Sequence, residues 1–280
     1  MGSKPCSCRP CALCCKPIEE AFGADRLDFK LDDSNWKEVF SKPGGIFAKC
    51  ACCNRNAFLA TRVIIALVWL GCVIWSIADW VDGYAEFKYW LTKLTHWGAM
   101  LELVYFCFAA ASTYMAIYGT VADGKGDATP WFVQVTWFLA ALVPCVTFLV
   151  VVLYWFLVFK PEDGAPQALS VVMHGGNFVL VLIDFLLCRQ PLYIAHVYIP
   201  LLFGTLYGIF TLVYYAAGGT FEDGVSKYIY AAIDWSDPGG TGKLLGLIVL
   251  LVLPIVYCGC FCLVAARRKC RRVQEEEVSV

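Results

Sequence analysis

The sequence predicts an all-α integral membrane protein, a six-transmembrane helical bundle with both termini cytoplasmic. Composition is the first observation behind this prediction: 60% of the 280 residues are hydrophobic and only 16% are charged. The second is that the apolar residues form runs long enough to cross a bilayer. The third is the uneven distribution of basic residues between the connecting segments.

Six apolar runs have the required length, and an even number of spans places both termini on the same side of the membrane. The predicted spans cover residues 57–78, 94–118, 131–159, 168–188, 192–217 and 244–266. We therefore expect a Cys-rich cytoplasmic tail over 1–56, a transmembrane domain over 57–266 and a basic-then-acidic cytoplasmic tail over 267–280. Within the first tail, the sequence predicts a short helix that starts near Trp36 and ends at Pro43.

Basic residues predict which side is cytoplasmic. With cytoplasmic termini, five of the 22 Lys and Arg residues fall outside and 17 fall inside, which satisfies the positive-inside rule. Arg62 is counted on the inner side in this scheme, close to the start of the first span. The five outer residues are Lys88, Lys93, Lys160, Lys227 and Lys243.

The sixteen cysteines follow the same topology. None lies in the predicted outer loops 79–93, 160–167 and 218–243, so we expect no structural disulfides. Cysteines beside basic residues at a membrane surface favour palmitoylation. The lipidation candidates are Cys6, Cys8, Cys11, Cys14, Cys15, Cys50, Cys52, Cys53 and Cys270.

A zinc site in the first tail is the alternative. Cys8, Cys11 and Cys14 have C-x-x-C spacing, but the tail contains no histidine and no separate second knuckle. We therefore expect no metal and no cofactor.

The fourth span carries polar residues that hydrocarbon disfavours. Asn177 and Asp184 are seven residues apart and share a helix face, and His174 lies one turn before Asn177. Ionisable side chains inside a membrane usually mark a functional interior. This face is a candidate site.

The second span has a matching pattern. Thr95 and Glu102 are also seven residues apart, and Tyr105 follows. Both spans run from outside to inside, so Thr95 and His174 are expected at one level near the outer surface, with Glu102 and Asp184 deeper. Glu102, Tyr105, Asn177 and Asp184 would then bind substrate or support the site.

A structural explanation of the same residues stays open. Polar side chains inside a bundle often form hydrogen bonds between helices, and Gly175 and Gly176 would let two helices approach closely. Neither of the other histidines, His96 and His196, belongs to a metal-binding spacing.

Several segments around the last outer loop form a recognisable pattern: YYAAGG at 214–219, YIY at 228–230, IDW at 233–235 and PG at 238–239. Together with LTHWG at 94–98 in the second span and with His174, Asn177 and Asp184 in the fourth, this pattern resembles the Rolling stone family. The resemblance implies a multi-pass membrane protein associated with myoblast fusion. In the loop itself, aromatic residues suit the membrane interface, and residues 237–240 predict a turn before the last span.

A more distant resemblance concerns chemistry. The placement of Thr95 and His174 is similar to that in the androgen-induced intramembrane hydrolases, which cleave fatty acid esters of hydroxy fatty acids. This resemblance implies that Thr95 is the nucleophile and His174 its acid/base partner.

Two functions are therefore expected from different classes. The first is a Rolling stone-like protein of cell–cell fusion or membrane organisation, with membrane lipids and unidentified fusion or adhesion proteins as partners. The alternative is an intramembrane hydrolase of lipid esters. A transporter is disfavoured, because broken helices do not recur in the two halves. We expect the plasma membrane, or else the endoplasmic reticulum, and no nucleic acid as a partner.

Overall fold

The computed structural model describes residues 36–44, 54–83, 87–120 and 129–278. Within these ranges its regular structure is helical, with one isolated bridge between Tyr230 and Ile233. Six helices are long and apolar enough to cross a membrane, which confirms the predicted all-α class with six spans. They cover Arg55–Val81, Leu94–Tyr118, Trp131–Val158, Ala168–Leu187, Ile194–Ala216 and Pro238–Arg267.

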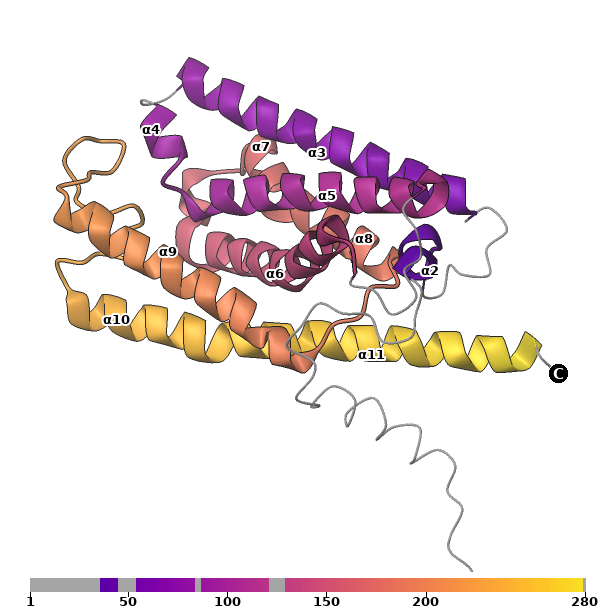
Figure 1. The fold of residues 1–280 in the computed structure, drawn as a ribbon. Coiled ribbons are helices and arrows are strands. Elements are labelled where there is room, and N and C mark those ends of the chain that lie inside the picture. The colour runs from indigo at the N-terminus through magenta and orange to yellow at the C-terminus, as the bar shows by residue number, and fades with distance from the viewer. Residues whose placement is uncertain (1–35, 45–53, 84–86, 121–128, 279–280) are drawn as a thin grey trace, which may run out of the picture.

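Several of these spans are composites of more than one helical segment (Figure 1). The first two spans are single helices, α3 (Arg55–Gly83) and α5 (Leu94–Tyr118). The third is α6 (Trp131–Leu153) continued by the π-helical η3 (Tyr154–Val158). The fourth joins α7 (Ala168–Val171), the π-helical η5 (Val172–Gly176) and α8 (Asn177–Leu187).

The remaining two spans also contain irregular turns. The fifth joins the 3-10 turn η6 (Ile194–Val197) to α9 (Tyr198–Ala216). The sixth joins α10 (Pro238–Leu247), the π-helical η7 (Ile248–Val252) and α11 (Leu253–Val278). Short helices α2 (Trp36–Ser41) and α4 (Phe87–Trp90) and the 3-10 turn η4 (Pro161–Asp163) lie between or before the spans.

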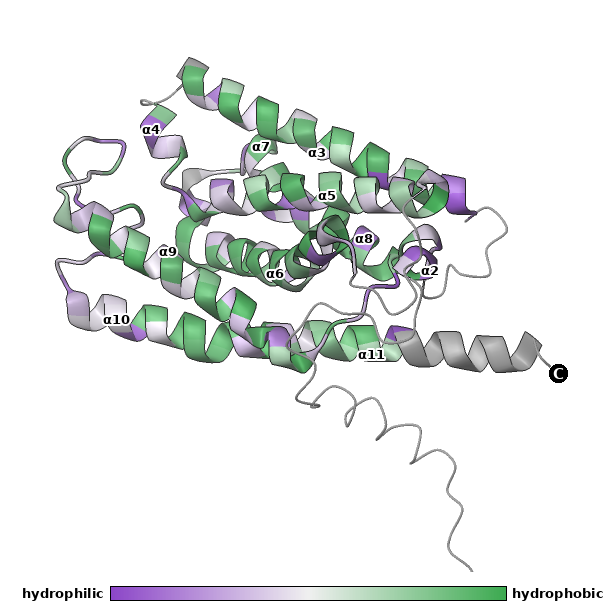
Figure 2. Cartoon of the chain, viewed as in Figure 1, coloured by the Kyte–Doolittle hydropathy of each residue, from purple (hydrophilic) through white to green (hydrophobic). Residues whose placement is uncertain are grey.

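Helix α6 forms the centre of the bundle. Its residues belong to two hydrophobic clusters, one shared with α3, α5 and α8 and the other with α9, α10 and α11. Trp137 and Val143 of α6 are fully buried. The outward faces are apolar as well (Figure 2), as with Leu67 at 62% and Leu250 at 75% exposure. Such a surface suits lipid rather than water.

The last span begins earlier than predicted. Residues 237–240, expected to form a turn, are instead the N-cap and the first turn of α10. Asp237 caps this helix, because its Oδ1 accepts a hydrogen bond from the Gly240 N–H at 3.0 Å, and Pro238 occupies the first helical position. An Asp followed by Pro is a helix-start signal as well as a turn signal.

The predicted short helix near Trp36 is confirmed by α2. Trp36 and Phe40 pack against Ala116 of α5 and Val133 of α6, at the end of the bundle opposite α4 (Figure 1). The helix α11 runs on to Val278, past the predicted start of the second tail.

The lipidation candidates fall outside what the structure describes. Eight of them lie in the segments 1–35 and 45–53 that precede the first span, and the side chain of Cys270 is not described. The described cysteines are all free thiols: Cys72, Cys107, Cys145, Cys188, Cys258, Cys260 and Cys262.

Candidate functional site

Thr95 and His174 lie side by side. Thr95 is in the first turn of α5, and its Oγ1 is 3.1 Å from Nε2 of His174 in η5. Both side chains are partly buried. A hydroxyl and an imidazole within hydrogen-bond distance form the minimal arrangement for nucleophilic catalysis.

His174 sits at a break in the fourth span. Its backbone angles, φ −122° and ψ 16°, are not helical, and the surrounding turn is π-helical. The His174 carbonyl accepts a hydrogen bond from the Trp155 indole N–H at 2.8 Å, and the Tyr154 ring stacks on the imidazole at 3.6 Å between centroids. Both aromatic residues come from η3, so two π-helical turns meet at the histidine. Such turns are frequent at functional sites.

Hydrogen bonding fixes the tautomer of the imidazole. Nδ1 of His174 is 2.9 Å from the Ser170 carbonyl oxygen, which can only accept. Nδ1 therefore carries the proton, and in the neutral ring Nε2 has a free lone pair that accepts from the Thr95 hydroxyl. His174 is oriented to take the proton of Thr95.

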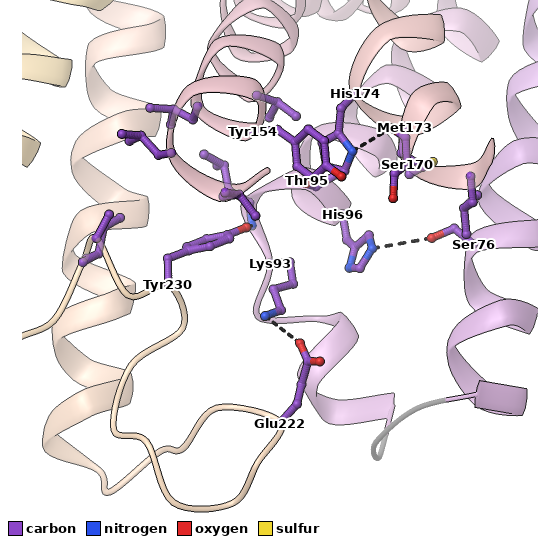
Figure 3. A pocket seen from close by; sticks show the side chains of 18 of the residues that line it. Ser76, Lys93, Thr95, His96, Tyr154, Ser170, Met173, His174, Glu222 and Tyr230 are labelled. Carbon is purple, nitrogen blue, oxygen red and sulfur yellow. Dashed lines mark hydrogen bonds and ion pairs between the residues drawn. The ribbon is translucent and has the colours of Figure 1, made fainter. Parts of the chain in front are cut away.

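A cavity of about 450 Å³ opens beside this pair (Figure 3). One part of its wall is polar and includes Ser76, Thr95, His96 and His174. The other part is apolar and is formed by side chains of the third, fourth and sixth spans: Val150, Leu153, Leu157, Val158, Leu169, Met173, Leu244 and Ile248. An amphipathic ligand matches such a cavity.

The loop between α9 and α10 closes one side of the cavity. Tyr230 and Ile233 from this loop line the wall, and the Tyr230 oxygen accepts a hydrogen bond from the Leu94 N–H at 2.9 Å. This contact satisfies a backbone donor at the start of α5, next to Thr95. Burial raises the pKa of Tyr230, so its hydroxyl stays protonated.

The same loop holds an ion pair at the edge of the cavity. Lys93 Nζ is 2.7 Å from Oε1 of Glu222 and donates to the Ile229 carbonyl at 3.4 Å. The ammonium group also lies 4.4 Å from the centroid of the Phe221 ring. Lys93 is thus held toward the loop (Figure 3).

A second hydroxyl–imidazole pair lies on the polar wall. Nδ1 of His96 is 2.6 Å from the Trp90 carbonyl oxygen, so this imidazole also carries its proton on Nδ1. Its Nε2 is 3.5 Å from Oγ of Ser76, which accepts a hydrogen bond from the Trp90 indole at 3.1 Å. The imidazole stacks on Trp90 with 4.2 Å between centroids.

Glu102 and Asn177 meet one layer deeper. Oε1 of Glu102 accepts from the Thr147 hydroxyl at 2.6 Å and from the Asn177 amide at 3.4 Å. Oε2 has no hydrogen-bond partner among the described residues, although Glu102 is only 2% exposed. Neither Glu102 nor Asn177 lines the cavity.

Asp184 belongs to a third layer, with Tyr105 and Arg62. The Asp184 carboxylate accepts from Arg62 Nε at 2.8 Å, from Arg62 Nη2 at 3.3 Å and from the Tyr105 hydroxyl at 2.6 Å. Arg62 Nη1 also donates to the Thr113 hydroxyl at 2.8 Å. The side chains of Arg62 and Asp184 are 2% and 1% exposed, so this is a buried ion pair within the bundle.

The three layers join the second and fourth spans through Thr95 with His174, Glu102 with Asn177, and Tyr105 with Asp184. The first contact is the one expected from the sequence, whereas Glu102 and Asp184, expected together, lie in separate layers because each has a different polar partner. Gly175 and Gly176 do not mediate close helix packing. A Cβ atom on Gly175 would meet no other heavy atom within 4 Å, and one on Gly176 would meet only Val172 of its own turn.

Comparison with known proteins identifies the family of this chain. The family model described as "Protein rolling stone" matches residues 49–280. The chain belongs to the Rolling stone family. A relative named "Protein rolling stone" from Drosophila melanogaster is 27% identical over 194 residues, which cover 66% of this chain and 68% of the relative. No solved structure matches the chain significantly.

The Rolling stone match contains every residue of the cavity and of the two deeper layers. Several of these residues escape sequence reasoning. Arg62 lies within an apolar run, and an ionisable residue there signals a buried partner. Its position near the predicted cytoplasmic end of the first span favours a surface role instead. Ser76 and Tyr154 carry no comparable signal. Among the described residues no group of three or more His, Cys, Asp or Glu side chains could hold a metal ion.

Proposed function

We propose that this Rolling stone family member is an intramembrane hydrolase of lipid esters, with Thr95 as the nucleophile and His174 as the acid/base. The observation that carries the proposal is the 3.1 Å contact between Thr95 Oγ1 and His174 Nε2. The Ser170 carbonyl supports it, because it leaves Nε2 free to accept the proton.

The proposed reaction has two steps. Thr95 Oγ1 attacks the ester carbonyl carbon while His174 Nε2 takes the hydroxyl proton, and the alcohol then leaves with that proton. Water attacks the acyl-Thr95 ester in the second step, with His174 again accepting a proton and returning it to Thr95. The products are one alcohol and one carboxylic acid.

Covalent labelling tests the hydrolase directly. A fluorophosphonate probe forms a bond to an activated hydroxyl and releases fluoride. We expect labelling of the purified protein, and its loss in Thr95→Ala and in His174→Ala. Thr205→Ala is the matched control, because this exposed hydroxyl bonds only to the Leu201 carbonyl of its own helix. No labelling of the folded wild-type protein would rule out the hydrolase.

A role in cell–cell fusion or membrane organisation is the second candidate. Membership of the Rolling stone family favours it, with the plasma membrane as the site of action and unidentified proteins on the apposed membrane as partners. The test is to deplete the protein from fusing cells, count multinucleate products, and restore either the wild type or Thr95→Ala. Unchanged fusion after depletion would exclude this role. Rescue of fusion by Thr95→Ala would show that the fusion role does not depend on hydrolysis.

A further inference from the structure

The charged groups of the cavity are few and already partly paired. Among the described residues that line it, the formally charged side chains are Asp79, Lys93 and Glu222. Their sum is one negative charge. Lys93, the cation of the set, has its ammonium group held by Glu222 at 2.7 Å and by the Ile229 carbonyl at 3.4 Å. An anionic head group would therefore meet no unpaired cation in this part of the wall.

Apart from those three groups, the hydrogen-bonding side chains around the candidate nucleophile are uncharged. They include the Thr95–His174 pair, the Tyr230 hydroxyl, the Ser76 hydroxyl and the His96 imidazole. Ser76 Oγ lines the cavity at 3.5 Å from His96 Nε2, a long contact, so a ligand oxygen can compete for the Ser76 hydroxyl proton. Hydroxyls and neutral imidazoles match ester and alcohol oxygens.

We propose that the cavity takes a lipid ester with an uncharged head group, and that Glu222 sets this preference by neutralising Lys93. The inference names the substrate class of the hydrolase proposed above and rests on that proposal. Without Glu222, the Lys93 ammonium would attract an anion into the cavity. The resemblance to the androgen-induced intramembrane hydrolases implies a different substrate class, because fatty acid esters of hydroxy fatty acids carry a free carboxylate.

Photo-crosslinking in neutral detergent micelles tests the preference. Two probes share one diazirine-bearing acyl or alkyl chain: a monoacylglycerol, which is uncharged, and an alkyl sulfate, which is a permanent anion. All variants carry Thr95→Ala, so the ester is not consumed and binding is measured apart from hydrolysis. Labelled peptides are quantified by mass spectrometry in segments 94–118, 131–158 and 168–187.

With Glu222 intact, we expect the monoacylglycerol to label these segments about tenfold more than the alkyl sulfate. Glu222→Gln should bring the two probes to within about threefold, because Lys93 is released. Adding Lys93→Met to Glu222→Gln should restore the preference. Glu162→Gln, an exposed glutamate on η4 outside the cavity, is the control and should change nothing.

Three results would overturn the inference. The first is equal labelling by both probes with Glu222 intact, and the second is a preference that Glu222→Gln leaves unchanged. The third is the absence of label from all three segments. The result is separable from that of the fluorophosphonate experiment. A protein that shows the preference but no fluorophosphonate labelling would have an uncharged-lipid site without hydrolysis. One that is labelled but shows no preference would be a hydrolase of another substrate class.

Discussion

Arg62 and Asp184 illustrate how a membrane bundle tolerates full charges. Each group is almost completely buried, and the carboxylate receives two guanidinium hydrogen bonds together with that of Tyr105. Removing one member of such a pair leaves an uncompensated charge, whereas removing both does not. The pair ties the first span to the fourth.

Arg62→Leu should lower the free energy of unfolding by about 3–5 kcal/mol, because Asp184 loses its counter-charge. The double variant Arg62→Leu/Asp184→Leu should recover most of this loss. The measurement is SDS titration of the purified protein in mixed micelles. Arg55→Leu, at an exposed position at the start of α3, is the control and should be close to wild type. A double variant no better than the single one would show that the charges do not act as a pair.

Glu102 behaves differently, because only one of its oxygens has a partner in the described part of the chain. Glu102→Gln keeps an acceptor for Thr147 and should change the free energy of unfolding by less than about 1 kcal/mol. Glu102→Ala removes that acceptor and should cost about 1–3 kcal/mol. The same titration compares the two variants. Equal losses would mean that the carboxyl group itself, and not only an acceptor oxygen for Thr147, is required.

At the scale of elements, the π-helical turns shape the candidate site. A regular fourth span would direct its carbonyl groups along the helix, whereas η5 leaves the His174 carbonyl to the Trp155 indole. The turn η3 supplies both Trp155 and Tyr154, which hold the histidine from two sides. Two neighbouring spans therefore position one imidazole.

The fifth and sixth spans approach closely at Gly204. A Cβ atom there would lie 2.8 Å from Cδ1 of Leu253 and 3.2 Å from Cγ2 of Val249. Gly204→Leu should therefore cost about 1–3 kcal/mol through overpacking. Gly246→Ala is the control, since a Cβ atom on Gly246 meets no other heavy atom within 4 Å. Thermal unfolding in detergent should separate the two variants, and equal melting temperatures would contradict this packing.

At the scale of the whole molecule, the basic residues predict that both termini face the cytoplasm. The loop between α9 and α10 would then face outward, and its Val225 is 79% exposed. Val225→Cys should react with a membrane-impermeant maleimide on intact cells, whereas the wild type should not, because its cysteines lie outside the predicted outer loops. Labelling of Val225→Cys only after permeabilisation would reverse the topology.

The sequence by itself determines the six spans and the polar faces of the second and fourth spans. Apolar length and helical period are local properties, so the six spans and the seven-residue spacings of Thr95 with Glu102 and Asn177 with Asp184 can be read directly. The family follows from local segments in the same way.

Only the tertiary structure decides which side chains meet across the bundle. Arg62 is the partner of Asp184, and Ser76 lines the cavity. Both contacts depend on how α3, α5 and α8 pack together, which the helical period of any one span does not reveal. The π-helical turn at His174 also depends on Tyr154 and Trp155 of a neighbouring span. In hydrocarbon, polar groups must find partners within the protein, and the packing of the spans determines which partners are within reach.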